Sequence, residues 1–134
     1  RLELLGGGAA DRLPIFAFRI GDGRGGHVHQ QLVTRLLSDR FGIQARGGCA
    51  CAGPYVHRLL DIGPAESESM RQAILAGDEI VKPGFTRLNF SVLLPDDKVA
   101  FILDSVVRLA AEAPDHRERY DFDGSRAIFF PRAA

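Results

Sequence analysis

Cysteine is scarce in this chain of 134 residues, and tryptophan is absent. The two cysteines, Cys49 and Cys51, are separated by one residue, which is too close for a disulfide that ties distant segments together. We expect both to be reduced thiols with local chemistry. An excess of charge of one sign is also missing, because 17 basic residues balance 17 acidic ones. Net charge therefore gives no reason to expect binding to nucleic acid or to a membrane.

Long apolar runs are missing as well. None reaches the roughly 18 residues that span a bilayer, and the start lacks the layout of a signal peptide, so we expect a soluble, cytoplasmic protein. The chain begins at Arg1, and its only methionine is Met70. We therefore expect residues 1–134 to be one domain with one core, cut from a longer polypeptide.

Hydrophobic periodicity predicts a mixed order of strands and helices. No element is predicted before residue 13, and the glycine-rich segment 47–54 is expected to be a loop. A last apolar run, 127–130, is expected to add an edge strand or to pack the tail. Strands are predicted at 14–20, 43–46 and 85–92, and helices at 27–40, 55–60, 65–75 and from about 95 to just before Pro114. This order predicts an α/β or α+β fold with helices on one face of a small sheet.

Gly21, Gly23 and Gly26 match the pattern G-x-G-x-x-G between a predicted strand and a predicted helix. The next strand, however, ends in Arg46 and not in the acidic residue that would bind a ribose. Too little chain remains for the second half of a doubly wound sheet. We therefore expect a flexible glycine turn here and not a nucleotide site.

Imidazole and thiol groups, which zinc prefers, occur at His27, His29, Cys49, Cys51 and His57. A structural zinc site needs a second pair of ligands besides the C-x-C pair, and the sequence offers none at a suitable spacing. Histidines two apart on a helix point to different sides. The spacing thus disfavours a metal site, and we expect these histidines to be exposed or locally hydrogen bonded. A thiol-carrier or metal-binding domain built on the two cysteines remains an alternative.

The segment Arg46-Gly47-Gly48-Cys49-Ala50-Cys51-Ala52-Gly53-Pro54 resembles the catalytic-cysteine loop of cysteine desulfurases and selenocysteine lyases. In that loop an arginine, a glycine, a cysteine followed by alanine, and a proline recur at this spacing. Segments 15–18, 41–46 and 86–91 resemble the same family in the same order, so that the resemblance covers roughly residues 13–110. The chain is therefore similar to the C-terminal small domain of class V aminotransferases and cysteine desulfurases, which are fold-type I enzymes dependent on pyridoxal phosphate.

This resemblance implies roles for three side chains. Arg87 matches the arginine that holds the carboxylate of the amino-acid substrate, since a planar guanidinium donates two parallel hydrogen bonds to it. Cys51 matches the catalytic, sulfur-accepting cysteine. Arg46 would lie near the same pocket, where it could assist the carboxylate or favour the thiolate of Cys51 electrostatically.

The resemblance also implies what the chain does not contain. The cofactor lysine of the family belongs to a large domain, and neither Lys82 nor Lys98 resembles it, so we expect no cofactor site here and an inactive fragment. The parent enzyme would use pyridoxal phosphate and would be a homodimer. The family loop usually has a histidine before the cysteine, whereas this chain has Cys49-Ala50, which leaves desulfuration, transamination and elimination all open. A stand-alone binding or interaction module is a further alternative.

Overall fold

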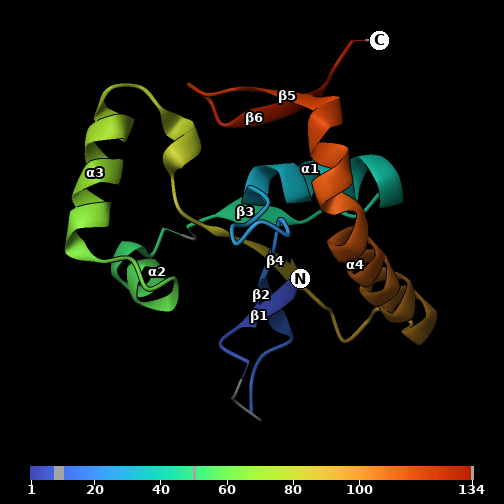
Figure 1. The fold of residues 1–134 in the computed structure, drawn as a ribbon. Helices are drawn as coiled ribbons and strands as arrows, with labels where there is room; N and C mark the ends of the chain where they lie inside the picture. Colours follow the sequence, from blue (N-terminus) through green and yellow to red (C-terminus); the bar gives the residue numbers. More distant parts are fainter. Residues whose placement is uncertain (8–10, 50, 134) are drawn as a thin grey trace.

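The structure is a computed structural model, and it describes residues 1–7, 11–49 and 51–133 (Figure 1). Within these residues strands and helices alternate irregularly along the chain. The elements are β1 (Leu2–Leu5), β2 (Ile15–Ile20), α1 (Gln30–Phe41), β3 (Arg46–Gly48), α2 (Gly53–Leu59), α3 (Pro64–Leu75), the 3-10 turn η1 (Glu79–Val81), β4 (Phe85–Asn89), α4 (Asp96–His116), the 3-10 turn η2 (Arg117–Arg119), β5 (Tyr120–Asp123) and β6 (Ile128–Pro131).

Four of the strands form an antiparallel sheet in the order β1-β2-β4-β3. Strand β4 thus lies between β2 and β3, which precede it in the chain. The register places four residues in one row across the sheet: Leu5, Ala17, Arg87 and Arg46. Paired residues of an antiparallel sheet point to the same face, so these four side chains share one face.

Helices α1 and α4 cover the other face of this sheet. Phe18, Ile20 and Leu88 point toward these helices, because they alternate with the residues of the row. The hairpin of β5 and β6 lies beside α1 and closes one end of this core with Phe129 (Figure 1). The remaining buried members come mostly from the two helices: Val28, Leu32, Val33, Leu36, Leu37, Ile43, Val106, Leu109, Ala110 and Ala113.

Helix α2 packs on the face that carries the row. Val56 of α2 is buried with Leu5 and Phe85, and Ala17 and Cys49 pack against this small cluster. The mixed α/β class that the sequence predicts is confirmed. Helices lie on both faces of the sheet, however, with α1 and α4 on one and α2 on the other.

Several predicted elements have different ends in the structure. The helix predicted from residue 27 begins at Gln30, because the two residues before His29 continue the β2 hairpin. His27 forms a bridge with Gly21, and the N–H of Val28 donates to the carbonyl of Ile20 at 2.8 Å. The strand predicted at 43–46 instead spans Arg46–Gly48, so two glycines assigned to the loop are part of the sheet.

The second half of the chain differs from the prediction at three places. Strand β4 ends at Asn89 and not at residue 92, because a turn follows in which the N–H of Leu94 donates to Ser91. Helix α4 continues past Pro114 to its end, since a proline in the last turn removes only one hydrogen bond. Residues 128–130 of the last apolar run lie in β6, which pairs with β5 and not with the main sheet. Strands β1 and β5 were not predicted.

Candidate functional site

Arg46 and Arg87, the two arginines predicted to bind substrate, lie side by side. They are direct partners in the β3–β4 pairing, so their Cβ atoms are about 4.5–5.5 Å apart on one face of the sheet. Arg46 is exposed and Arg87 is half-buried. On its other side Arg87 is paired with Ala17, which packs against the small buried cluster under α2.

The pairing of Arg46 and Arg87 puts two positively charged side chains on neighbouring strands of one sheet face. Within the residues that the structure describes, neither has a carboxylate within ion-pair distance. Other arginines have such partners: Arg19 contacts Glu3 at 2.9 Å and Arg35 contacts Asp39 at 2.7 Å. Two like charges directly opposite each other in a sheet repel. A bound anion would relieve that repulsion.

The segment after β3 brings two thiols to the same part of the sheet. Cys49 is half-buried against the cluster of Leu5, Val56 and Phe85, which also contacts Ala17, the neighbour of Arg87. Cys51 is exposed and has a φ of 55°. A left-handed backbone costs a non-glycine residue about 1–2 kcal/mol, and such strain clusters at functional sites.

These side chains define a candidate site for a small anion next to a thiol. A guanidinium binds a planar carboxylate through two parallel hydrogen bonds, and two adjacent arginines offer more donors than one carboxylate needs. Cys51 is exposed, so a small molecule can reach its thiol. The structure therefore brings Arg46 and Arg87 together and places the cysteine segment directly after Arg46.

The lysines of the chain do not fit the role of a cofactor lysine. Lys82 is exposed and forms an ion pair with Glu79 in the η1 turn. Lys98 is exposed in the first turn of α4, on the side of the sheet opposite to Arg87. Neither amine lies where it could form a Schiff base beside the arginine pair. Among the described residues, neither lysine therefore fits the role of the lysine that binds pyridoxal phosphate.

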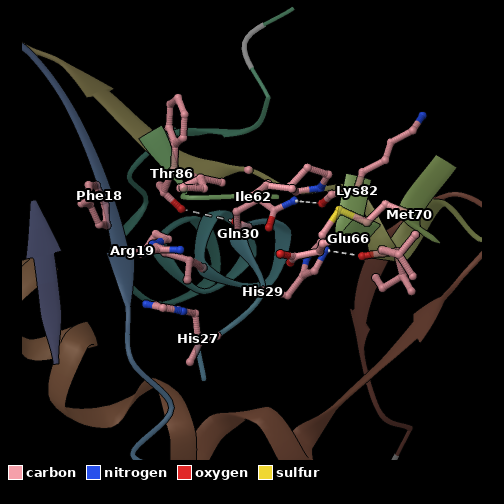
Figure 2. Close-up of a pocket in the computed structure, with 18 residues that line it drawn as sticks. Phe18, Arg19, His27, His29, Gln30, Ile62, Glu66, Met70, Lys82 and Thr86 are labelled. Carbon is pink, nitrogen blue, oxygen red and sulfur yellow. Dashed lines mark hydrogen bonds between the residues drawn. The ribbon is translucent and has the colours of Figure 1, made fainter. Parts of the chain in front are cut away.

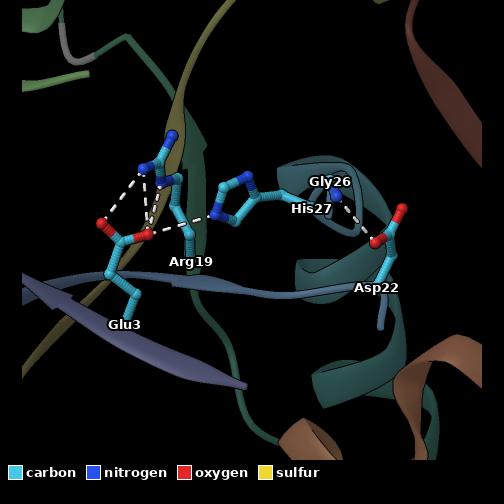
Figure 3. A network of polar contacts seen from close by, with 5 residues as sticks. All are labelled: Glu3, Arg19, Asp22, Gly26 and His27. Atoms are coloured by element: carbon cyan, nitrogen blue, oxygen red, sulfur yellow. Dashed lines mark hydrogen bonds and ion pairs between the residues drawn. The ribbon is translucent and has the colours of Figure 1, made fainter. Parts of the chain in front are cut away.

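The three histidines considered as metal ligands have separate surroundings. His27 Nε2 lies 3.1 Å from a carboxylate oxygen of Glu3, in a network with Arg19 (Figure 3). His57 contacts the carbonyl of Gly53 through Nδ1 at 2.7 Å and the hydroxyl of Ser67 through Nε2 at 2.9 Å. Across the described part of the chain, no three histidine, cysteine or acidic side chains are grouped so that they could hold a metal ion.

The glycine loop between β2 and α1 is closed by its own carboxylate. Asp22 Oδ1 accepts a hydrogen bond from the backbone N–H of Arg24 at 2.8 Å. It accepts a second one from the N–H of Gly26 at 2.9 Å (Figure 3). The bond from Arg24 is the largest cause that lowers the pKa of Asp22. These are the kind of backbone amides that cradle a phosphate in a nucleotide site. The loop therefore holds Asp22 where a phosphate would lie.

A cavity of about 270 Å³ lies between the start of α1, the segment from α2 to α3 and the segment before β4 (Figure 2). Its lining includes His29, Gln30, Glu66, Met70 and Lys82. His29 Nδ1 accepts from the N–H of Gln31 at 3.2 Å, so Nε2 carries the proton that is donated to the carbonyl of Ile80 at 3.0 Å. Burial lowers the pKa of His29.

The sequence did not predict that these residues line a common cavity. His29 was considered only as a metal ligand, and its partner Ile80 lies far away in the chain. Periodicity detects which face of a helix is buried but gives no information on which distant carbonyl a cap residue meets. The same reason applies to the contact between Glu3 and His27.

Comparisons with known proteins leave the family open: no protein-family model, no curated protein and no solved structure matches the chain. In the ranges that the structure describes, none of the helices is long and apolar enough to cross a bilayer.

Proposed function

We propose that this chain is the small domain of an enzyme similar to class V aminotransferases and cysteine desulfurases. In this proposal Arg87, assisted by Arg46, binds the carboxylate of an amino-acid substrate. The observation that carries it is the pairing of the two arginines across β3 and β4 without a carboxylate partner among the described residues. Two paired arginines without a carboxylate partner among the described residues support an anion site, and the sequence resemblance indicates which anion.

Cys51 has the second role in this proposal. It lies on the exposed segment directly after β3, where a thiolate could reach a sulfur or selenium atom of a substrate held by Arg87. The thiolate would attack that atom, form a sulfur–sulfur or sulfur–selenium bond, and displace the carbon group as the leaving group. If Cys51 were inert, the arginine pair would still position an amino acid for transamination or elimination.

The proposal assigns the remaining parts to the rest of the enzyme. Pyridoxal phosphate, when bound there, supplies the electron sink that amino-acid chemistry needs. The proposed protein is a cytoplasmic, homodimeric transferase or lyase. Both cysteines are free, as is usual in a reducing compartment.

The experiment uses the complete gene product that contains these residues. We expect a yellow protein whose absorbance changes on addition of L-cysteine. In Arg87→Gln the KM for the amino acid should rise roughly 10- to 100-fold, because hydrogen bonds to a charged group contribute about 1.5–3 kcal/mol. Arg71→Gln is the matched control, since Arg71 is exposed on α3 and pairs with Glu68; its KM should not change.

A second variant separates the reactions. If Cys51 accepts sulfur, Cys51→Ser abolishes release of sulfide and alanine while substrate still changes the spectrum. A yellow protein that is inert toward cysteine would indicate an aminotransferase or lyase. A colourless gene product that gains no absorbance with added pyridoxal phosphate would contradict the proposed function.

A further inference from the structure

A serine and a histidine on neighbouring helices are hydrogen bonded to each other, away from the arginine pair. Nε2 of His57 lies 2.9 Å from Oγ of Ser67, and Nδ1 of His57 lies 2.7 Å from the carbonyl oxygen of Gly53. We propose that Ser67 is a nucleophile activated by His57, and that the two side chains hydrolyse small uncharged carboxylic esters. This activity needs no cofactor and does not rest on the proposed function.

The two partners of His57 fix the position of its ring proton. A backbone carbonyl only accepts hydrogen bonds, so Nδ1 of the neutral ring carries the proton and donates to Gly53. Nε2 is then an acceptor, and the hydroxyl of Ser67 is the donor of the second bond. A hydroxyl that donates to a histidine oriented by a third group is the arrangement that activates serine nucleophiles.

Helix α2 orients His57 without help from Ser67. Val56, the residue before His57, is 1% exposed in the small cluster with Leu5, so this part of α2 is fixed to the sheet. The bond from His57 to Gly53 spans one turn of the same helix. The ring is therefore held within α2, as a general base must be held at hydrogen-bond distance from the proton that it takes.

A tight turn between α2 and α3 brings Ser67 to His57 (Figure 1). The N–H of Ile62 donates to the carbonyl of His57 at 2.8 Å. Asp61 has a left-handed φ of 56° in this turn, a conformation that aspartate adopts more readily than most residues. Helix α3 then begins at Pro64, whose fixed φ suits the first helical position. Ser67 follows within the first turn of α3 and meets His57 across the connection.

The surroundings of the two side chains indicate the kind of ester. Both are half-buried, so a small molecule can reach them. Neither lines the cavity shown in Figure 2, and that cavity gives no reason to expect a long acyl chain. Glu68, beside Ser67, forms an ion pair with Arg71 at 3.0 Å, and Glu66 on the other side disfavours a negatively charged substrate. We therefore expect a short, uncharged carboxylic ester.

The reaction consumes the ester and water. Oγ of Ser67 attacks the carbonyl carbon while Nε2 of His57 takes the hydroxyl proton. The bond from this carbon to the alkoxy oxygen then breaks, and His57 returns the proton to the leaving alcohol, which leaves an acyl group on Ser67. Water attacks this acyl group with His57 again as the base. The carboxylic acid departs, and Oγ of Ser67 regains its proton.

The test is covalent labelling of the complete gene product with diisopropyl fluorophosphate, which transfers its phosphoryl group to an activated serine and releases fluoride. Trypsin places Ser67 in the peptide 59–71, whose fragmentation distinguishes Ser67 from Ser69. We expect label on Ser67 in the folded protein. His57→Gln should slow this labelling roughly 100-fold, because a positioned general base contributes about 10²–10⁴-fold. Ser69→Ala is the matched control, since Ser69 is exposed on the same helix; it should not change the rate.

Hydrolysis of p-nitrophenyl acetate gives a second readout, after both cysteines have been blocked with an alkylating agent. Ser67→Ala should abolish turnover of the ester, whereas Ser69→Ala should retain it. Circular dichroism checks that the variants fold.

Two results with the wild-type protein would overturn the proposal, whatever the variants do. One is folded protein without label on Ser67, because the hydrogen bond would then only fasten α3 to α2. The other is labelling of Ser67 as fast in urea as in buffer, because the fold would then contribute nothing to its reactivity.

Discussion

Glycine contacts position the segment that carries the cysteines. An added Cβ on Gly47 would lie 3.0 Å from the carbonyl oxygen of Gln30, and one on Gly84 would lie 2.6 Å from the carbonyl carbon of Gly48. Gly48 itself has a φ of 131°, which side chains rarely tolerate. Close backbone contacts therefore hold the start of the cysteine segment between α1 and the residue before β4.

Gly84→Ala should destabilise the protein by about 1–3 kcal/mol, because the backbone of Gly48 must move to admit the methyl group. Gly53→Ala is the matched control: an added Cβ at Gly53 meets nothing within 4 Å, and alanine in α2 should be neutral or stabilise by about 0.4–1 kcal/mol. Urea unfolding of both variants measures the difference. Equal stability of the two would contradict the close contact between Gly84 and Gly48.

At the scale of elements, two leucines of α4 differ in how much they contribute to the core. Leu109 is fully buried between α4 and the core, whereas Leu103 is 51% exposed. Leu103 and Val107 are apolar but exposed, because the helix turns Ser105 and Leu109 inward. The hydroxyl of Ser105 donates to the carbonyl of Phe101 at 2.7 Å, so burying this serine leaves no unpaired donor.

Leu109→Ala should lower the free energy of unfolding by about 2–5 kcal/mol through lost burial and a cavity. Leu103→Ala, on the same helix, should change it by no more than about 0.5 kcal/mol. Chemical denaturation of the two variants makes the comparison. A larger loss for Leu103 than for Leu109 would contradict the burial of Leu109 in α4.

The sequence was sufficient to predict the long elements, whose patterns extend over several turns. Helix α3 and strand β2 agree with their predicted positions within one residue. Strand β1 has only four residues and starts the chain, so its pattern was too short to recognise. Strand β3 was displaced because its glycines carry no hydrophobic signal, although their lack of a Cβ is what allows the strand to approach α1.

The candidate site was partly predictable. The resemblance assigned a role to Arg87, and the structure places Arg87 on the face of β4 that points away from the main core. Its direct pairing with Arg46 could not be derived from spacing, because strand order depends on tertiary packing. The pairing of Asp22 with the amides of its own loop was also missed, since the motif does not indicate which backbone amides a loop carboxylate meets.

At the scale of the whole molecule, His29 joins three regions. It caps α1, donates to Ile80 in η1 and lies 5.2 Å from the ring of Phe129 in β6. Burial lowers its pKa below the ordinary 6.5, so the unfolded chain binds a proton more readily than the folded one. Neutral His29 therefore does not lower the free energy of unfolding above about pH 6.5. The free energy of unfolding falls as the pH drops from there toward the lowered pKa of the folded state.

His29→Asn should remove this loss of stability between about pH 6.5 and 5. Asparagine keeps an acceptor at the helix start but has no titratable proton. Thermal melts at several pH values measure the effect in both proteins. Some carboxyl groups, Glu3 among them, have a pKa that folding lowers from an ordinary value near 4.5 or below. Their effect on the free energy of unfolding therefore appears at lower pH than that of His29. An unchanged pH dependence in the variant would assign the effect to another group.

The insertion of β4 between β2 and β3 sets the order in which the molecule can be assembled. Hairpin β1–β2 can form early from neighbouring residues, but Arg46 has no partner strand until residues 85–89 arrive. Pairings between distant segments form slowly, because the loop entropy is lost before contacts compensate for it. The two guanidinium groups therefore meet late in folding, and any partial opening that releases β4 separates them while the β1–β2 hairpin persists.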